Sequence, residues 1–185
     1  PGHVRIEGEL DIGGQEHFYL ETHASIAWLD TAGGLTVASS TQHPAETQAS
    51  VAHVLGVPQH QVSVECLRMG GAFGGKEWQA ATFAAVAAVG AWKTKRPVRV
   101  RLPRDLDMVL SGKRHPYLAK YDATFDASGL VQQVRIALWS DGGWSLDLSE
   151  AVMYRSLFHV DNAYRIPVLD VTGRVCRTNK TSQTA

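Results

Sequence analysis

The chain has 185 residues, of which 44% are hydrophobic and 19% charged, so it is long enough to bury a core and too apolar to be disordered. Its 18 basic and 18 acidic side chains cancel, which gives no reason to expect nucleic acid as a partner. No apolar run approaches the ~18 residues that a membrane span needs, and no signal-peptide pattern opens the sequence. We therefore expect a cytoplasmic protein with neither a membrane nor a nucleic-acid partner.

The two cysteines, Cys66 and Cys176, each lie in a strand-like segment. A disulfide framework needs more cysteines and a zinc site needs closer pairs, so we expect both to be reduced and buried. None of the eight histidines has the H-x-x-x-H or H-E-x-x-H spacing of a metal site. The first residues, 1–3, and the last, 182–185, resemble cuts through a longer polypeptide.

The first predicted elements are a hairpin and a helix. Residues 18–29 have the composition of an extended strand, and the glycine turn 32–34 joins them to a second strand over 35–39. A helix is predicted to begin at Pro44, because proline suits the first turn, and to end at Gly56.

A glycine-rich stretch separates the next strand from the next helix. Residues 61–68 alternate like a strand, and residues 80–92 form an apolar, alanine-rich run that predicts a helix. This run is apolar nearly all round, with Phe83 and Val86 among its larger members, so we expect the helix to be buried on several sides. Cations and Pro97 follow the run and favour the end of the helix there.

The second half of the chain predicts further strands and helices. These are a strand over 98–102, a short helix over 105–110, a hairpin of 117–125 and 131–139, a helix over 148–158 and a strand over 173–178. The sum is an α+β fold, a mixed sheet with several strands and three or four packed helices.

The stretch Met69-Gly-Gly-Ala-Phe-Gly-Gly-Lys-Glu77 comes within one residue of a phosphate-binding P-loop. Backbone N–H groups of such a turn can approach an anion closely, with the helix dipole behind them. Glu77 nevertheless stands where a P-loop needs a hydroxyl for magnesium, and its charge would repel phosphate. We interpret the stretch as a loop near a cofactor; a phosphate site and a plain glycine turn stay as alternatives.

Three polar residues could contact a ligand. Glu77 stands at the predicted start of a buried helix, where it could exchange a proton with a bound molecule or simply stabilise the helix end. Arg155 lies among apolar residues on a predicted helix, so it either points outward or meets an anionic group. Gln15 precedes a strand and is placed for a hydrogen bond, although a surface role explains a lone glutamine as well.

Five motifs resemble the molybdenum-binding part of the xanthine dehydrogenase/oxidase family, and they follow one another in the family's order with compatible spacing. They are GGQEHFYLET at 13–22, QHP at 42–44, GGAFGGKE at 70–77, LFHVDN at 157–162 and CRTN at 176–179. The resemblance runs nearly from end to end. It implies that residues 1–185 form part of the molybdenum-cofactor-binding domain of a longer molybdenum hydroxylase.

The resemblance also implies an activity and its cofactors. The family hydroxylates purines, from hypoxanthine and xanthine to urate, with water as the oxygen source. It uses molybdopterin with molybdenum, and it passes electrons through iron–sulfur clusters to FAD elsewhere in the enzyme. A purine substrate, the iron–sulfur and FAD domains or subunits, and a homodimer or higher assembly are therefore the expected partners.

Carried over residue by residue, the resemblance gives five positions a role. Gln15 matches a glutamine that hydrogen-bonds an oxo ligand of molybdenum, and Phe73 and Gly74 match loop residues whose backbone approaches the cofactor. Gln15 and Phe73 would lie near molybdenum without binding it directly. Glu77 matches the glutamate that binds the purine, and Arg155 matches the arginine that steadies charge on the purine oxygen. Both are predicted to be catalytic and substrate-binding residues.

Two alternatives remain open at this point. Aldehyde oxidase-type hydroxylases look similar but generally lack this glutamate and arginine, so the presence of Glu77 and Arg155 favours purines. A non-catalytic α+β module that binds a phosphate-bearing ligand is the second alternative. The family's general base and aromatic clamp would follow Ala185, so the 185 residues alone are expected to be inactive.

Overall fold

Residues 4–185 are described by a computed structural model and form two compact units. Unit 1 comprises residues 4–15, 113–183 and 185, and unit 2 comprises residues 16–112 and 184. Residues 1–3, at one of the two expected cuts, lie outside the described part of the chain. The four α-helices and eight strands of residues 4–185 confirm the predicted α+β class.

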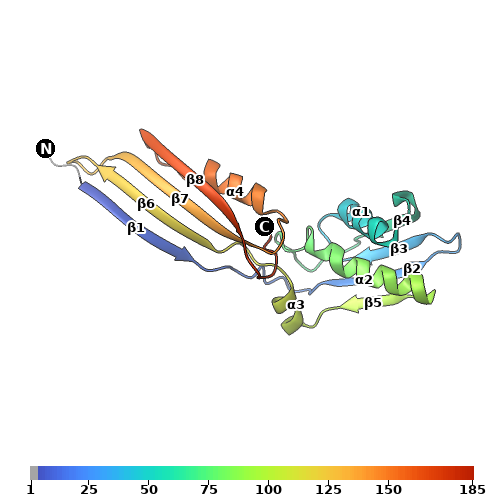
Figure 1. Cartoon of the computed structure of the whole chain (residues 1–185). Helices are drawn as coiled ribbons and strands as arrows, with labels where there is room; N and C mark the ends of the chain where they lie inside the picture. Colours follow the sequence, from blue (N-terminus) through green and yellow to red (C-terminus); the bar gives the residue numbers. More distant parts are fainter. Residues whose placement is uncertain (1–3) are drawn as a thin grey trace. The chain divides into compact units, whose positions relative to one another are not determined.

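Unit 1 is a four-stranded sheet with one helix on it, its strands in the order β1-β6-β7-β8 (Figure 1). The elements are β1 (Val4–Ile12), β6 (Tyr117–Phe125), β7 (Val131–Gly143), α4 (Ser149–Phe158) and β8 (Val168–Arg177). β1, β6 and β7 are antiparallel neighbours, whereas β8 runs parallel to β7. α4 lies in the connection between β7 and β8, because parallel strands need a crossover.

α4 packs on the sheet at a glycine of β8. A Cβ added at Gly173 would collide with Met153 Sδ and would lie 3.0 Å from Leu157 Cδ2. Met153 and Leu157 belong to the same face of α4, one turn apart. The helix therefore approaches the sheet as closely as a residue without a side chain permits.

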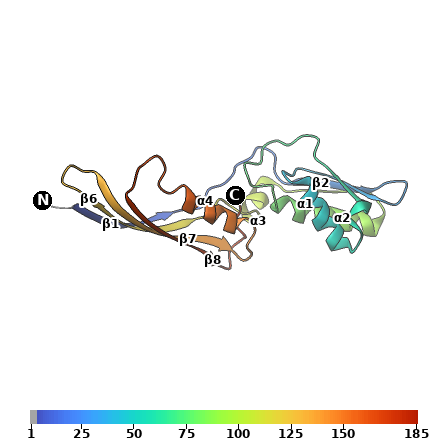
Figure 2. The same cartoon turned by 90° about the horizontal axis from the view of Figure 1, so that it is seen from above.

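Unit 2 is a second four-stranded sheet, in the order β4-β3-β2-β5, with α1 and α2 on one face (Figure 2). Its strands are β2 (Ala24–Leu29), β3 (Leu35–Ser39), β4 (Val62–Glu65) and β5 (Val98–Arg101). Its helices are α1 (Pro44–Leu55), α2 (Gln79–Thr94), α3 (Arg104–Leu110) and a short 3-10 helix, η1 (Gln59–Gln61). β3 and β4 are parallel, and the other neighbours are antiparallel.

The core of unit 2 is built from the alanines of α2. Ala84, Ala87, Ala88 and Ala91 have no exposed surface, whereas Val86 is 56% exposed. The expectation that the helix is buried on several sides is therefore wrong at Val86. Small side chains let the helix lie close to β2 and α1, and alanine also has the highest intrinsic helix propensity.

Most of the predicted elements are confirmed, and the exceptions have local causes. Only the part of 18–29 from Ala24 onward is a strand, since Phe18 has a φ of +48° and interrupts the extended backbone. β1 was not predicted, because this edge strand is exposed along nearly all of its length. Cys66 and Cys176 are half-buried rather than buried.

Candidate functional site

The glycine loop, residues 69–77, connects β4 to α2 in unit 2 and ends two residues before the helix. Gly71, Phe73 and Gly74 adopt left-handed backbone conformations, with φ of +92°, +53° and +93°. Glycine tolerates this region, but Phe73 does so at an energetic cost of roughly 1–3 kcal/mol. Such strain persists only where the surrounding structure determines the backbone conformation, so the backbone at Phe73 is held in place by its neighbours.

The N–H groups of the glycine loop already have partners in the chain. Gly70 N–H donates to Glu21 Oε2 at 2.8 Å, and Gly74 and Lys76 N–H donate to Gln42 Oε1 at 3.0 and 3.2 Å. Gly75 N–H donates to the carbonyl of Ala72 at 2.8 Å. These four groups are therefore not an open cradle for an anion.

Lys76, the lysine of the P-loop-like pattern, points into the protein. Its side chain has no exposed surface, and its ammonium donates to the Glu21 carbonyl at 2.6 Å and to Ser40 Oγ at 2.8 Å. The same ammonium lies 4.5 Å from the centre of the Tyr19 ring. Burial lowers the pKa of Lys76, and the Glu21 and Asp107 carboxylates partly offset that effect. A lysine held in this way does not reach a phosphate, which counts against the alternative of a P-loop-like phosphate site.

Glu21 links the glycine loop to the end of β3. Its Oε2 accepts hydrogen bonds from Ser40 Oγ and from Gly70 N–H, both at 2.8 Å, and lies 3.7 Å from Lys76 Nζ. Partial burial would raise the pKa of Glu21, but the hydrogen bonds and the lysine charge bring it below its usual value. The carboxylate is thus held in its charged form beneath the loop.

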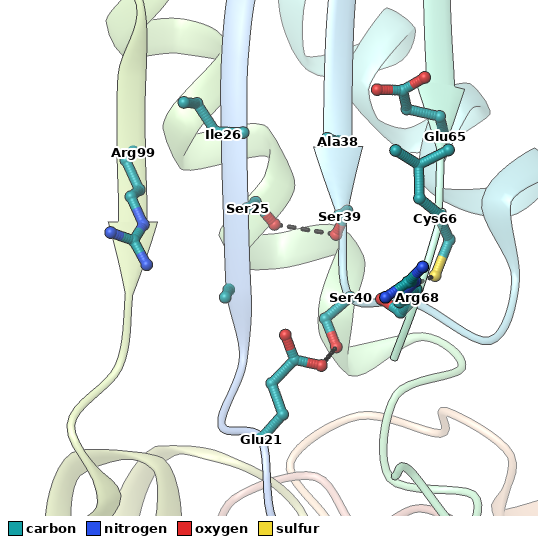
Figure 3. Close-up of a pocket in the computed structure, with 12 residues that line it drawn as sticks. Glu21, Ser25, Ile26, Ala38, Ser39, Ser40, Glu65, Cys66, Arg68 and Arg99 are labelled. Atoms are coloured by element: carbon teal, nitrogen blue, oxygen red, sulfur yellow. Dashed lines mark hydrogen bonds between the residues drawn. The ribbon is translucent and has the colours of Figure 1, made fainter. Parts of the chain in front are cut away.

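A groove of about 500 Å³ runs along the face of unit 2 opposite to α1 and α2 (Figure 3). Arg99, Ile26, Ala38 and Glu65 are register partners across its four strands. The groove ends at Glu21 and Ser40, whose hydrogen bond is drawn in Figure 3. The groove therefore borders Glu21, which supports the glycine loop.

A second buried polar pair lies behind Tyr19. His23 Nδ1 and Asp107 Oδ1 are 2.6 Å apart, and both side chains are 1% exposed. The Tyr19 hydroxyl lies 3.1 Å from His23 Nδ1 and donates to Asp107 Oδ1 at 3.3 Å. Burial is the main reason that the pKa of the Tyr19 hydroxyl is raised. His23 and Asp107 therefore hold the hydroxyl of Tyr19, whose ring lies against the Lys76 ammonium.

The predicted site residues fall into two groups. Phe73, Gly74 and Glu77 belong to the glycine loop of unit 2, where Phe73 is 62% exposed and Glu77 is half-buried. Gln15 and Arg155 belong to unit 1, and both are exposed. Gln15 is held by its backbone, because its carbonyl accepts from Arg114 N–H at 3.0 Å. The structure thus brings three of the five residues together in one loop.

Gln42 is the residue that the sequence analysis missed. It follows β3, and its side-chain oxygen accepts both N–H groups from Gly74 and Lys76, while its own N–H donates to the Lys76 carbonyl at 2.9 Å. The Nε2 of the same amide carries two further N–H donors, which an amide side chain offers to a neighbouring acceptor. The QHP motif marked this position, but nothing in it announced a contact 32 residues along the chain.

Comparison with known proteins decides the family. Residues 2–185 match the family model of the molybdopterin cofactor-binding domain. The chain belongs to this family. It is 49% identical over 181 residues to xanthine dehydrogenase/oxidase of Mus musculus and 50% identical to that of Rattus norvegicus, covering 97% of this chain and 14% of each relative. The chain therefore spans only a small part of the curated relatives that it matches.

Solved structures agree on the fold of this family member. An aldehyde oxidoreductase from Desulfovibrio gigas has a TM-score of 0.89 at 24% identity, over 98% of this chain and 20% of that one. Quinoline 2-oxidoreductase from Pseudomonas putida 86 has a TM-score of 0.83 at 20% identity, over 98% and 24% of the two chains. Among residues 4–185, the helices are all too short or too polar to cross a bilayer.

Proposed function

We propose that this chain is the part of a purine-oxidising molybdenum hydroxylase that presents the glycine loop to a molybdopterin cofactor. The observation that carries the proposal is the loop itself, in which Phe73 and Gly74 keep a left-handed backbone and Gln42 Oε1 binds the N–H group of Gly74. The identity of about one half to xanthine dehydrogenase/oxidase supports a purine substrate. An aldehyde oxidase-type substrate range is the second candidate, since the aldehyde oxidoreductase of Desulfovibrio gigas shares the fold.

The residues of the loop fit a bulky, oxygen-bearing group. Gly74 adds no side chain where the backbone turns outward, and Gln42 Nε2 offers a donor whose orientation is set by two protein N–H groups. When bound, a molybdopterin centre would supply the two-electron oxidation and the transfer of a water-derived oxygen. Gln42 and the Phe73–Gly74 backbone would hold that centre on the side of unit 2.

Glu77 and Arg155 are proposed to recognise the purine. A carboxyl group near a ring nitrogen and a guanidinium near an exocyclic oxygen both bind more tightly as negative charge spreads over the ring. Glu77 stands free of the tight contacts that hold Lys76, at the point where the loop turns into α2. Arg155 lies exposed on α4, as an arginine that meets an external anion must.

Gln15 keeps its predicted role as a hydrogen-bond donor to the cofactor, but Gln42 is the stronger candidate. Gln42 contacts the cofactor loop directly, whereas Gln15 belongs to unit 1. We also propose, as the family resemblance implies, that the rest of the protein carries iron–sulfur clusters and FAD, that the enzyme is a homodimer or higher assembly, and that it is cytoplasmic. The 185 residues alone then supply only part of the active site.

The full-length protein tests this function. Glu77→Ala and Arg155→Met are each expected to lower xanthine turnover roughly 100- to 1000-fold, by analogy with a lost oxyanion-hole donor, with molybdenum and pterin content near normal. Activity on small aromatic aldehydes should fall less. Glu65→Ala and Arg165→Met, at exposed positions of the same two units, are matched controls.

The molybdenum content of full-length variants distinguishes the proposed roles of Gln42 and Gln15. Gln42→Ala is expected to lower molybdenum content more than Gln15→Ala, because the Gln42 side chain accepts hydrogen bonds from the loop backbone. Equal losses of xanthine and aldehyde turnover in the Glu77 and Arg155 variants would point to damaged folding, and the purine assignment would fall.

A further inference from the structure

Lys76 is the most completely tied residue of the glycine loop. Its ammonium donates to the Glu21 carbonyl and to Ser40 Oγ, lies 3.7 Å from the Glu21 carboxylate and rests on the Tyr19 ring. These contacts come from the segment before β2 and from the end of β3. The side chain is thus anchored to the body of unit 2 and not to the loop from which it comes.

The backbone of Lys76 is fixed as well. Its N–H donates to Gln42 Oε1 at 3.2 Å, and its carbonyl accepts from Gln42 N–H at 2.9 Å and from Thr41 Oγ1 at 3.3 Å. Gly75, the residue before it, has no room for a side chain, because a Cβ there would lie 2.8 Å from Tyr19 Cε1. The peptide group that leads into Glu77 therefore has a single direction.

We propose that Lys76 is a positioning residue that fixes the direction in which Glu77 leaves the glycine loop. Glu77 is its neighbour in sequence and only half-buried, so its side chain takes its starting direction from the tied peptide before it. The proposal rests on the proposed function of Glu77 as the group that meets the substrate. A rigid support of this kind reduces the ordering that substrate binding would otherwise require.

Packing alone would not call for a lysine at this place. Burying an ammonium is unfavourable, and an apolar side chain of similar length would fill the same volume without that cost. What the ammonium adds is direction, because its hydrogen bonds to two fixed oxygen atoms hold the chain in one geometry. The choice of lysine at position 76 therefore indicates that the loop backbone has to be held in one position.

The test uses the full-length protein with Lys76→Met, which keeps the length of the side chain and removes its donors. We expect hydrogen exchange of peptides covering residues 69–78 to rise roughly 10-fold while the strands of unit 2 stay protected. We expect kcat/KM for xanthine to fall roughly 10- to 100-fold, as for a misplaced binding group. Turnover of a small aromatic aldehyde should change less. Lys95→Met is the matched control, since Lys95 also lies 4.5 Å from an aromatic ring, that of Trp92, but is exposed.

A double variant shows whether Lys76 acts through Glu77. In a Glu77→Ala background, Lys76→Met should have little further effect on xanthine kcat/KM, because the group that it positions is gone. Losses that multiply in the double variant, or unchanged exchange in residues 69–78, would overturn the proposal. Absence of xanthine oxidation in the unmodified protein would contradict the proposed function instead, and the exchange measurement would then decide the positioning role by itself.

Discussion

The two units place their charged side chains differently. Unit 2 buries several of them: Lys76, His23 and Asp107 have at most 1% of their side-chain surface exposed. His23 and Asp107 lie within hydrogen-bond distance of the Tyr19 hydroxyl, and the Lys76 ammonium lies over the Tyr19 ring. In unit 1, the pairs Arg5–Asp122, Glu9–Lys120 and Asp141–Lys180 each have a cation that is more than half exposed. A buried polar network has few alternative geometries, whereas surface pairs tolerate many.

This difference matches what each unit has to hold. Unit 2 keeps a strained, glycine-rich loop in one conformation, and its network reaches the loop through Glu21, Gln42 and Lys76. Unit 1 carries Arg155 on a helix, an element that keeps its shape through its own backbone hydrogen bonds. A loop needs outside support for accuracy, and a helix needs much less.

The largest effect is expected from the centre of the buried network. Asp107→Ala takes the carboxylate from His23 and Tyr19 and should lower the free energy of opening of unit 2 by about 3–5 kcal/mol, because two buried polar groups each lose a partner at a cost of roughly 1–3 kcal/mol. Hydrogen exchange of the full-length protein, measured separately for peptides of the two units, gives this quantity. Peptides of unit 1 should be unchanged.

The matched control is Asp122→Ala in unit 1. Asp122 pairs with Arg5, whose side chain is largely exposed, so no measurable change is expected in either unit. If the two variants destabilise their units equally, the contrast between buried and surface pairs does not hold.

A backbone position in unit 1 should give the next largest effect. Gly143 has a φ of +75°, and a Cβ there would collide with the carbonyl oxygen of Thr181 and lie 2.7 Å from Ser182 Cα. Gly143→Ala should destabilise unit 1 by roughly 2–3 kcal/mol, through the left-handed conformation and the clash together. Gly129 has a φ of +86° with nothing near its Cβ, so Gly129→Ala should cost only about 1 kcal/mol. Identical hydrogen exchange in Gly143→Ala and Gly129→Ala would mean that the backbone near Thr181 moves away from the added Cβ at little cost.

Acid should produce the smallest of the three effects. Burial would raise the pKa of Asp107, but the hydrogen bond and charge of His23 bring it below its usual value. An acid whose pKa is lowered by folding stabilises the protein above its unfolded pKa, so the loss begins as the pH falls below about 4. One such group contributes at most about 1.4 kcal/mol per pH unit. Asp107→Ala should reduce the loss of stability of unit 2 at low pH and leave that of unit 1 unchanged. Hydrogen exchange, corrected for the intrinsic pH dependence of amide exchange, measures both.

Local features of the fold were predictable because short-range chemistry determines them. Pro44 at the start of α1, Gly56 in the left-handed conformation at its end, and the turn before Gly129 all act within a few residues. Such signals depend on which backbone angles a residue tolerates, and those are the same in any context. The family resemblance, and not a local rule, assigned roles to Phe73 and Gly74, and these roles stay predictions.

The support of the loop was not predictable, since its partners are distant in sequence. Lys76 meets Glu21 over 55 residues, and Gly74 meets Gln42 over 32. Periodicity indicates which face of an element is buried, but it does not indicate which polar side chains meet inside. The phosphate site stayed open as an alternative for this reason: the pattern contained a suitable lysine, and only the tertiary structure shows that Lys76 is already paired.

Gly173 has a consequence for how unit 1 can vary. The missing side chain on β8 sets the height at which α4 lies over its sheet, and Arg155 is carried on that helix. Any larger residue at 173 would lift Met153 and Leu157, and the guanidinium would rise with them. With Arg155 in its proposed role, the substrate range would then change through the spacing between helix and sheet alone, while Arg155 itself stays the same.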